Sequence, residues 1–145
     1  MKINHILVPY DGSDPSKRAF KFALNLAKKS NSSITAITCI LENYYEPDAG
    51  FSEEEKEKLL RSQETAATKL LSVLELQAQE AHVPFKVSIL KSTSVSEAIL
   101  SYVEKHVIDL IVIGSRGLGG FKKLLLGSVA SGVSQHSKCP VLIVK

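Results

Sequence analysis

The sequence contains no tryptophan, only two cysteines, and only 6% aromatic residues among its 145. With so few aromatic side chains, the core has to be built mainly from Leu, Ile, Val and Ala. The two cysteines, Cys39 and Cys139, match no metal-binding spacing. Each lies in or beside an apolar run, so we interpret both as small buried apolar residues and expect no disulfide.

A large excess of one charge is also missing, because 18 lysines and arginines are opposed by 15 aspartates and glutamates, a net charge of +3. So small an excess argues against nucleic-acid binding, which needs a concentrated basic face. No apolar run approaches the roughly 20 residues that cross a bilayer. The chain also opens directly into a strand-like run, unlike a signal peptide. We therefore expect a cytoplasmic protein with neither a membrane nor a nucleic acid as partner.

The length fits one domain over residues 1–145, and 44% hydrophobic residues suffice for a core. Apolar runs alternate with helical patterns from end to end. The short apolar runs predict five strands, at residues 5–8, 34–41, 85–90, 110–113 and 139–144. Apolar residues at spacings of three and four predict intervening helices at residues 14–30, 52–82, 94–103 and 128–136.

Three of these helices begin with a capping signal. Asp14 precedes Pro15, so we expect the Asp14 carboxylate to cap the first helix. Ser52 and Ser94 are each followed three positions later by a glutamate, which is the pattern of a capping box.

The alternation of helices with strands too apolar to face water predicts a doubly wound α/β fold. We expect a five-stranded parallel sheet with helices on both faces, as in Rossmann-like proteins. In such sheets, ligands bind beyond the carboxyl ends of the strands, where the strand order reverses. The segments that leave those ends are therefore the candidates for a functional site.

The segment after the fourth predicted strand is the most informative of these. Gly114 and Gly117 are followed by Gly119-Gly120, and glycines let backbone N–H groups approach an anion closely. Gly127 and Ser128 then open the last helix, whose N-terminus offers free N–H groups to a phosphate. Ser128 either caps this helix or donates its hydroxyl to the phosphate. The spacing is neither a P-loop nor a dinucleotide fingerprint, so it leaves open a phosphate cradle or an ordinary loop.

With these residues in view, the sequence resembles the universal stress protein family. Gly114, Gly117, Gly127 and Ser128 are similar to the motif of its ATP-binding branch, in which the glycines are separated by two and nine residues. Residues 6–13, 107–114 and 139–144 also resemble the family's first strand, its run into the glycines and its last strand. The resemblance extends over the whole chain and is weakest at residues 42–60.

The resemblance implies an adenine nucleotide alpha hydrolase-like fold with an ATP site. Asp11 would accept hydrogen bonds from the ribose hydroxyls, because a carboxylate offers several lone pairs to a diol. Pro9 and Tyr10 would lie beside Asp11, and the adenine would lie against Cys39 and Ile113. The phosphates would be held by Gly114, Gly117, Gly127, Ser128 and Val129, with Mg²⁺ or Mn²⁺ between phosphate oxygens. Arg116 would either add charge there or point to solvent.

Two positions depart from the pattern. Cys39 stands where related sequences often carry valine, so the packing on the adenine is expected to differ modestly. Thr93 stands where many relatives have glycine after the third strand.

The resemblance implies a nucleotide-dependent regulatory protein of the stress response, which acts through binding and as a homodimer paired through its last strand. Pairing would also remove an unpaired sheet edge. The first alternative is a slow ATPase or an autophosphorylating enzyme. However, phosphoryl transfer needs a positioned base, and Asp11, the only obvious carboxylate, is engaged by the ribose. We therefore predict no catalytic residue. A phospho-accepting receiver domain, the second alternative, would need an acid after the third strand, where residues 90–93 have none.

Overall fold

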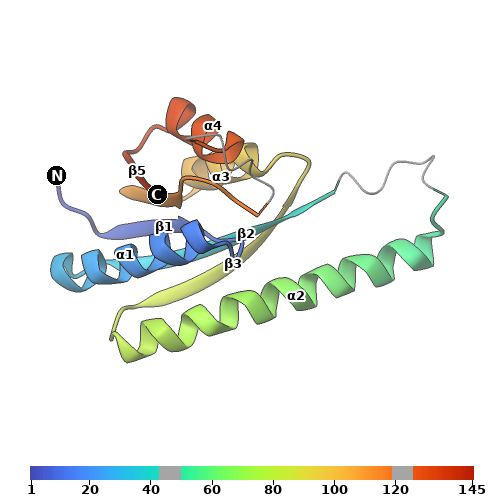
Figure 1. The fold of residues 1–145 in the computed structure, drawn as a ribbon, viewed down its shortest axis with the longest axis horizontal. Helices are drawn as coiled ribbons and strands as arrows, with labels where there is room; N and C mark the ends of the chain where they lie inside the picture. The colour runs from blue at the N-terminus through green and yellow to red at the C-terminus, as the bar shows by residue number, and fades with distance from the viewer. Residues whose placement is uncertain (43–49, 119–125) are drawn as a thin grey trace.

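The computed structural model describes residues 1–42, 50–118 and 126–145 (Figure 1). Its sheet has five parallel strands in the order β3-β2-β1-β4-β5, which confirms the predicted doubly wound fold. Most of the predicted loop at residues 42–51, and Gly119-Gly120, lie outside the described residues. The elements are β1 His5–Pro9, α1 Asp14–Ser30, β2 Ser33–Leu41, α2 Glu53–Glu80, β3 Phe85–Ser92, α3 Val95–Lys105, β4 Leu110–Gly114, α4 Ser128–His136 and β5 Val141–Val144.

The central strand β1 determines where a ligand can bind. It pairs with β2 on one side, where Ile6 lies opposite Ile34, and with β4 on the other, where Ile6 lies opposite Leu110. The chain thus builds outward from β1 to β3 and then returns to place β4 against the free side of β1. The strand order reverses between β1 and β4, and their carboxyl ends form the switch point.

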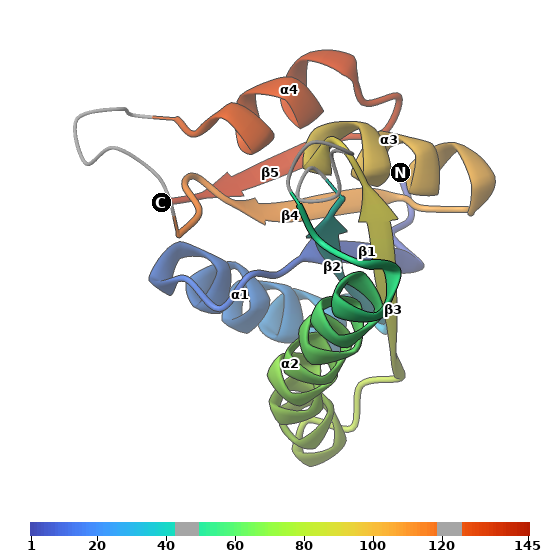
Figure 2. The same cartoon turned by 90° about the vertical axis from the view of Figure 1, so that its right-hand side faces the viewer.

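Two apolar cores lie on opposite faces of the sheet. Ile6 and Val8 of β1 face α1 and α2, whereas Leu7 faces α3 and α4. Figure 2 shows these two pairs of helices on either side of the sheet. Both cores are mainly aliphatic, as expected, although Phe20 is among the largest fully buried side chains.

The structure confirms Ser52 and Ser94 as capping residues, the serine half of each predicted capping box. Ser52 Oγ accepts from the Glu55 N–H at 3.1 Å, and Ser94 caps α3 in the same way. The prediction for Asp14 was wrong, because Ser13 caps α1 and its Oγ accepts from the Ser16 N–H at 3.3 Å. Ser13 has extended backbone angles, as a capping residue needs, while Asp14 is already the first helical residue.

The start of β1 contains a histidine that makes stability sensitive to pH. His5 Nε2 lies 2.6 Å from Thr35 Oγ1 on the neighbouring strand. Burial lowers the pKa of His5, and the Lys86 ammonium and His106 lower it further, although the Asp109 carboxylate opposes them. The folded state therefore binds this proton more weakly than the unfolded state does.

We expect this difference to destabilise the fold on acidification. As the pH falls below about 6.5, the unfolded state takes up a proton that folded His5 resists, so the free energy of unfolding decreases. His5→Gln should show a shallower decrease between pH 8 and pH 5 in urea unfolding. Parallel pH profiles for the wild type and His5→Gln would contradict this assignment.

Candidate functional site

A cavity of about 580 Å³ lies at the switch point, beyond the carboxyl ends of β1 and β4. Its wall is formed by the ends of β1, β2 and β4 and by the first turns of α3 and α4. All eleven residues that the sequence singled out line this cavity: Pro9, Tyr10, Asp11, Cys39, Ile113, Gly114, Arg116, Gly117, Gly127, Ser128 and Val129. Their contact with a ligand stays a prediction.

One half of the cavity is apolar. Cys39 and Ile113 contribute to it as expected, but Ile37, Val95 and Ile99 also line it, and sequence reasoning missed these three. Val95 and Ile99 belong to α3, whose first turn lies near the carboxyl end of β3. The capping box that starts α3 carried the signal, because a helix start after a parallel strand lies at the ligand-binding edge.

The other half is formed by the first turn of α4. Gly127 occupies the cap position, and no side chain caps this helix, in contrast to α1, α2 and α3. The first of the two predicted roles for Ser128, as the cap, is therefore excluded, since Ser128 is the first helical residue. Ser128 and Val129 both line the cavity. The positive end of the helix dipole, with N–H groups that have no intrahelical partner, thus borders the cavity.

The carboxylate of Asp11 joins two distant segments at the mouth of the cavity. Its Oδ1 accepts from the Ser13 N–H at 2.9 Å and its Oδ2 accepts from the Leu118 N–H at 3.1 Å. A Cβ on Gly117 would lie 2.7 Å from Asp11 Oδ2, so this approach requires glycine. The Asp11 carboxylate thus links the turn after β1 to the segment after β4.

Gly114 and Gly127 also have structural roles that the motif did not reveal. A Cβ on Gly114 would lie 2.8 Å from the carbonyl carbon of Pro15, so Gly114 lets the start of α1 pack on β4. The Gly127 N–H donates to the Ser115 carbonyl at 2.6 Å. This N–H group is thus engaged within the protein, and the cavity-facing donors of α4 come from the residues that follow it.

Tyr10 and Cys39 contribute to the cavity from opposite faces of the sheet. The Tyr10 ring is buried and packs edge-on against Phe20, with ring centroids 6.3 Å apart. Burial raises the pKa of Tyr10, and the Asp11 carboxylate raises it further. Cys39 and Cys139 were both predicted to be buried, but both are half-buried; neither forms a disulfide. Burial and the Glu42 carboxylate raise the pKa of the Cys39 thiol, with the backbone of Ser92 opposing them.

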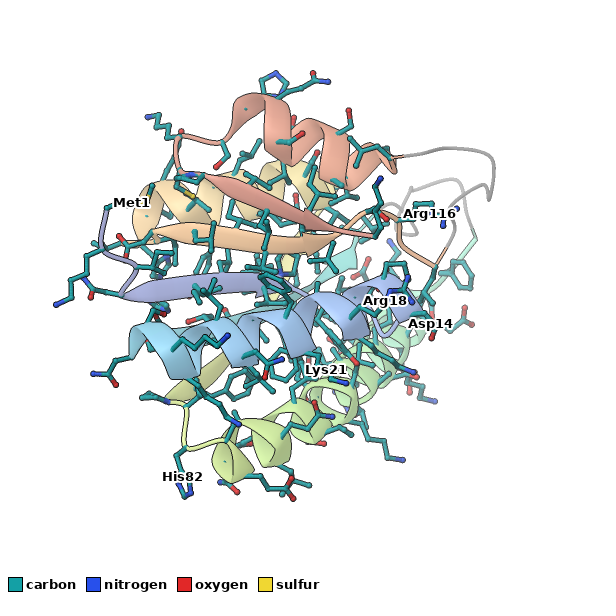
Figure 3. The ribbon with its side chains drawn as sticks, turned by 60° about the vertical axis from the view of Figure 1, so that its left-hand side comes forward. Met1, Asp14, Arg18, Lys21, His82 and Arg116 are labelled. Atoms are coloured by element: carbon teal, nitrogen blue, oxygen red, sulfur yellow. The ribbon has the colours of Figure 1, made fainter. Side chains whose placement is uncertain are left out.

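Arg116 also lies at this edge of the sheet. It is half-buried and lines the cavity, and Figure 3 shows it close to the end of β4. Thr93, the second departure from the family pattern, is exposed and does not line the cavity. The residues that line the cavity come from elements on both sides of the switch point.

The chain matches the Universal stress protein family over residues 2–145. It belongs to this family. It is 36% identical to universal stress protein MJ0531 of Methanocaldococcus jannaschii, over 97% of this chain and 81% of the relative. It is 34% identical to universal stress protein YxiE of Bacillus subtilis, over 98% of this chain and 99% of the relative.

Solved structures show the same fold. Universal stress protein UspA from Lactobacillus plantarum superposes with a TM-score of 0.82 at 24% identity, over 100% of this chain and 99% of that one. A universal stress protein in complex with cAMP superposes with a TM-score of 0.74 at 24% identity, over 100% of this chain and 99% of that one. A universal stress protein family protein from Arabidopsis thaliana with AMP bound superposes with a TM-score of 0.69 at 24% identity, over 98% of this chain and 91% of that one.

Two further observations apply to the described residues alone. None of their helices is long and apolar enough to cross a membrane. They also contain no group of three or more His, Cys, Asp or Glu side chains that could hold a metal ion.

The packing at Gly114 predicts that a Gly→Ala substitution lowers stability more at this position than at Gly132. Gly114→Ala should lower the free energy of unfolding by about 1–3 kcal/mol, because its Cβ meets the backbone of Pro15. Gly132→Ala in α4 is the matched control, since its Cβ meets only the Ser96 side chain, at 3.3 Å. The control should stay within about 1 kcal/mol of the wild type, because alanine favours a helix interior. Equal stability of the two variants in urea unfolding would refute the packing role.

Proposed function

We propose that this chain binds ATP in the cavity at the switch point and acts as a nucleotide-dependent regulatory protein of the stress response. One observation carries the proposal: the first turn of α4, which no side chain caps, borders the same cavity as an apolar wall from β2 and α3. A helix N-terminus suits phosphate, and an apolar wall suits a purine. The AMP and cAMP held by two structural relatives support the nucleotide class.

The residues fit an adenine nucleotide at each end of the cavity. Its volume of about 580 Å³ lies within the range of roughly 300–1,000 Å³ that is usual for small-molecule sites. The adenine would lie among Cys39, Ile99 and Ile113. Asp11 would accept from the ribose hydroxyls, because a carboxylate has about four lone-pair positions and only two are used by backbone donors.

The phosphates would be held by backbone groups more than by side chains. The N–H groups of Ser128 and Val129 would donate to phosphate oxygens, and the Arg116 guanidinium would add positive charge at the mouth. A divalent cation, Mg²⁺ or Mn²⁺, would bridge the phosphates mainly through phosphate and water oxygens. This preference for phosphate and water ligands is compatible with the absence of a metal-binding cluster in the described residues.

Binding is favoured over fast hydrolysis. Phosphoryl transfer needs a residue that orients or deprotonates the attacking group. Among the described residues that line the cavity, Asp11 is the only carboxylate, and in this proposal its remaining lone pairs accept from the ribose hydroxyls. Slow ATP hydrolysis or autophosphorylation remains the alternative, and sustained phosphate release would favour it.

The same proposal includes a homodimer through β5. This strand is at the edge of the sheet, and all four of its residues are half-buried. Its free side therefore presents unpaired backbone groups beside aliphatic side chains. Pairing with a second copy would satisfy those groups and remove the edge.

Ser128→Asp tests the phosphate end of the site. A carboxylate on the first residue of α4 would repel the phosphates, so we expect ATP affinity to fall at least about tenfold. The fold should not suffer, because a negative charge at a helix N-terminus contributes about 0.3–1 kcal/mol of stability. The measurement is calorimetric titration of ATP with magnesium into protein freed of any co-purified nucleotide.

Ser134→Asp is the matched control, since Ser134 is an exposed residue toward the other end of the same helix. It should bind ATP within about twofold of the wild type, because its added charge lies beyond the reach of screened interactions. Undiminished ATP affinity in Ser128→Asp would contradict the assignment of the phosphates to the first turn of α4. Thermal melting of both variants would exclude misfolding as the cause of a loss of affinity.

Alkylation of the Cys39 thiol tests the adenine end of the site. ATP should slow alkylation of Cys39 in a Cys139→Ser variant, because the bound base would cover the thiol. Cys139 lies outside the cavity, so its alkylation in a Cys39→Ser variant should be unaffected by ATP. The reaction is best followed by mass spectrometry at about pH 9, because the raised pKa of Cys39 leaves little thiolate at neutral pH. Equal protection of both thiols would contradict the assignment.

A further inference from the structure

A second groove, with a volume of about 640 Å³, lies between α1 and the second half of α2. It is on the face of the sheet opposite α3 and α4. Phe20 and Leu74, each only 1% exposed, belong to its lining, and Leu24 and Val73 extend the apolar surface outward. Apart from Tyr10, it shares no lining residue with the cavity at the switch point.

The rim of this groove is cationic. Lys17, Lys21 and Lys28 all line it from α1, and their spacing of four and seven residues places them along one side of the helix. Figure 3 shows Lys21 on the side of α1 that faces α2. None of the three ammonium groups forms an ion pair within the described parts of the chain. Glu80 is the single carboxylate among the lining residues, so the groove carries net positive charge.

Tyr10 adds an unused hydrogen-bond donor at the base of the groove. Its side chain is 6% exposed, and its hydroxyl forms no hydrogen bond with any described residue. The hydroxyl nevertheless contacts solvent, because no side-chain polar atom of the described residues is both fully buried and unpaired. The Tyr10 ring packs edge-on against Phe20, which also lines the groove.

We propose that this groove binds a small amphiphilic anion, a phosphate monoester with a short apolar body. Lys17 and Lys21 would pair with the phosphate, and the Tyr10 hydroxyl would donate to one of its oxygens. The apolar body would lie against Leu24 and Val73. The volume lies within the usual range of small-molecule sites, and the proposal commits to a soluble monoester as the ligand class. The proposal does not depend on ATP binding at the switch point.

The test uses hexyl phosphate as the probe, with inorganic phosphate and hexanol as comparators, in a residue-resolved NMR titration of the full chain. We expect hexyl phosphate to shift amides of α1 and of residues 73–81. It should bind at least about tenfold more tightly than either comparator, because neither one combines the charge with the apolar body. Tyr10→Phe should weaken its binding several-fold, since one hydrogen bond is lost.

The double variant Lys17→Gln/Lys21→Gln should weaken the binding of hexyl phosphate at least about tenfold. Lys29→Gln/Lys58→Gln is the control, because it removes the same net charge from exposed lysines outside the groove, and it should bind like the wild type. Equal losses in the two double variants would overturn the proposal, as would equal binding of inorganic phosphate and hexyl phosphate. Shifts confined to the first turn of α4 would also overturn it, while leaving ATP binding supported. Binding only to phosphatidylglycerol vesicles would refute the soluble ligand class.

Discussion

The close approach of α1 to the end of β4 is the constraint on which the rest of the site depends. Gly114 permits it, because any side chain there would meet the backbone at Pro15. With α1 in this position, the Asp11 turn before it lies beside the segment that follows β4, and the carboxylate accepts from the Leu118 N–H. Parallel pairing of β1 with β4 thus brings together two loops that are distant in the sequence.

The division of the cavity into a polar and an apolar half follows from the same topology. Helices that follow parallel strands begin at the ligand-binding edge, so α3 and α4 both present their first turns there. The hydroxyl of Ser94 caps α3, which leaves its apolar residues Val95 and Ile99 to form the wall. In α4 the cap position is held by Gly127, so its N–H groups remain available. The two helix starts therefore differ in capping, and α4 is the one without a side-chain cap.

Much of the fold could be predicted from the sequence, because a strand buried on both faces must be apolar throughout, as residues 110–113 are. The glycines after the fourth strand drew attention by their position and spacing, and Asp11 by the resemblance to the family; all of them that are described line the cavity. The sequence could not decide between Ser13 and Asp14 as the cap of α1, since both side chains can cap and only the backbone angles distinguish them. Nor could it find Ile37 and Ile99, because their place in the cavity depends on strand order.

In the proposed function, Asp11 helps to hold a nucleotide and takes no part in cleaving it. A general base has to reach the attacking water and accept its proton. If Asp11 moved toward a water beside the phosphates, its bonds to the N–H groups of Ser13 and Leu118 would break. The hydrogen bond that joins the turn after β1 to the segment after β4 would then be lost. A role as general base would therefore compete with the two hydrogen bonds that Asp11 makes in this structure.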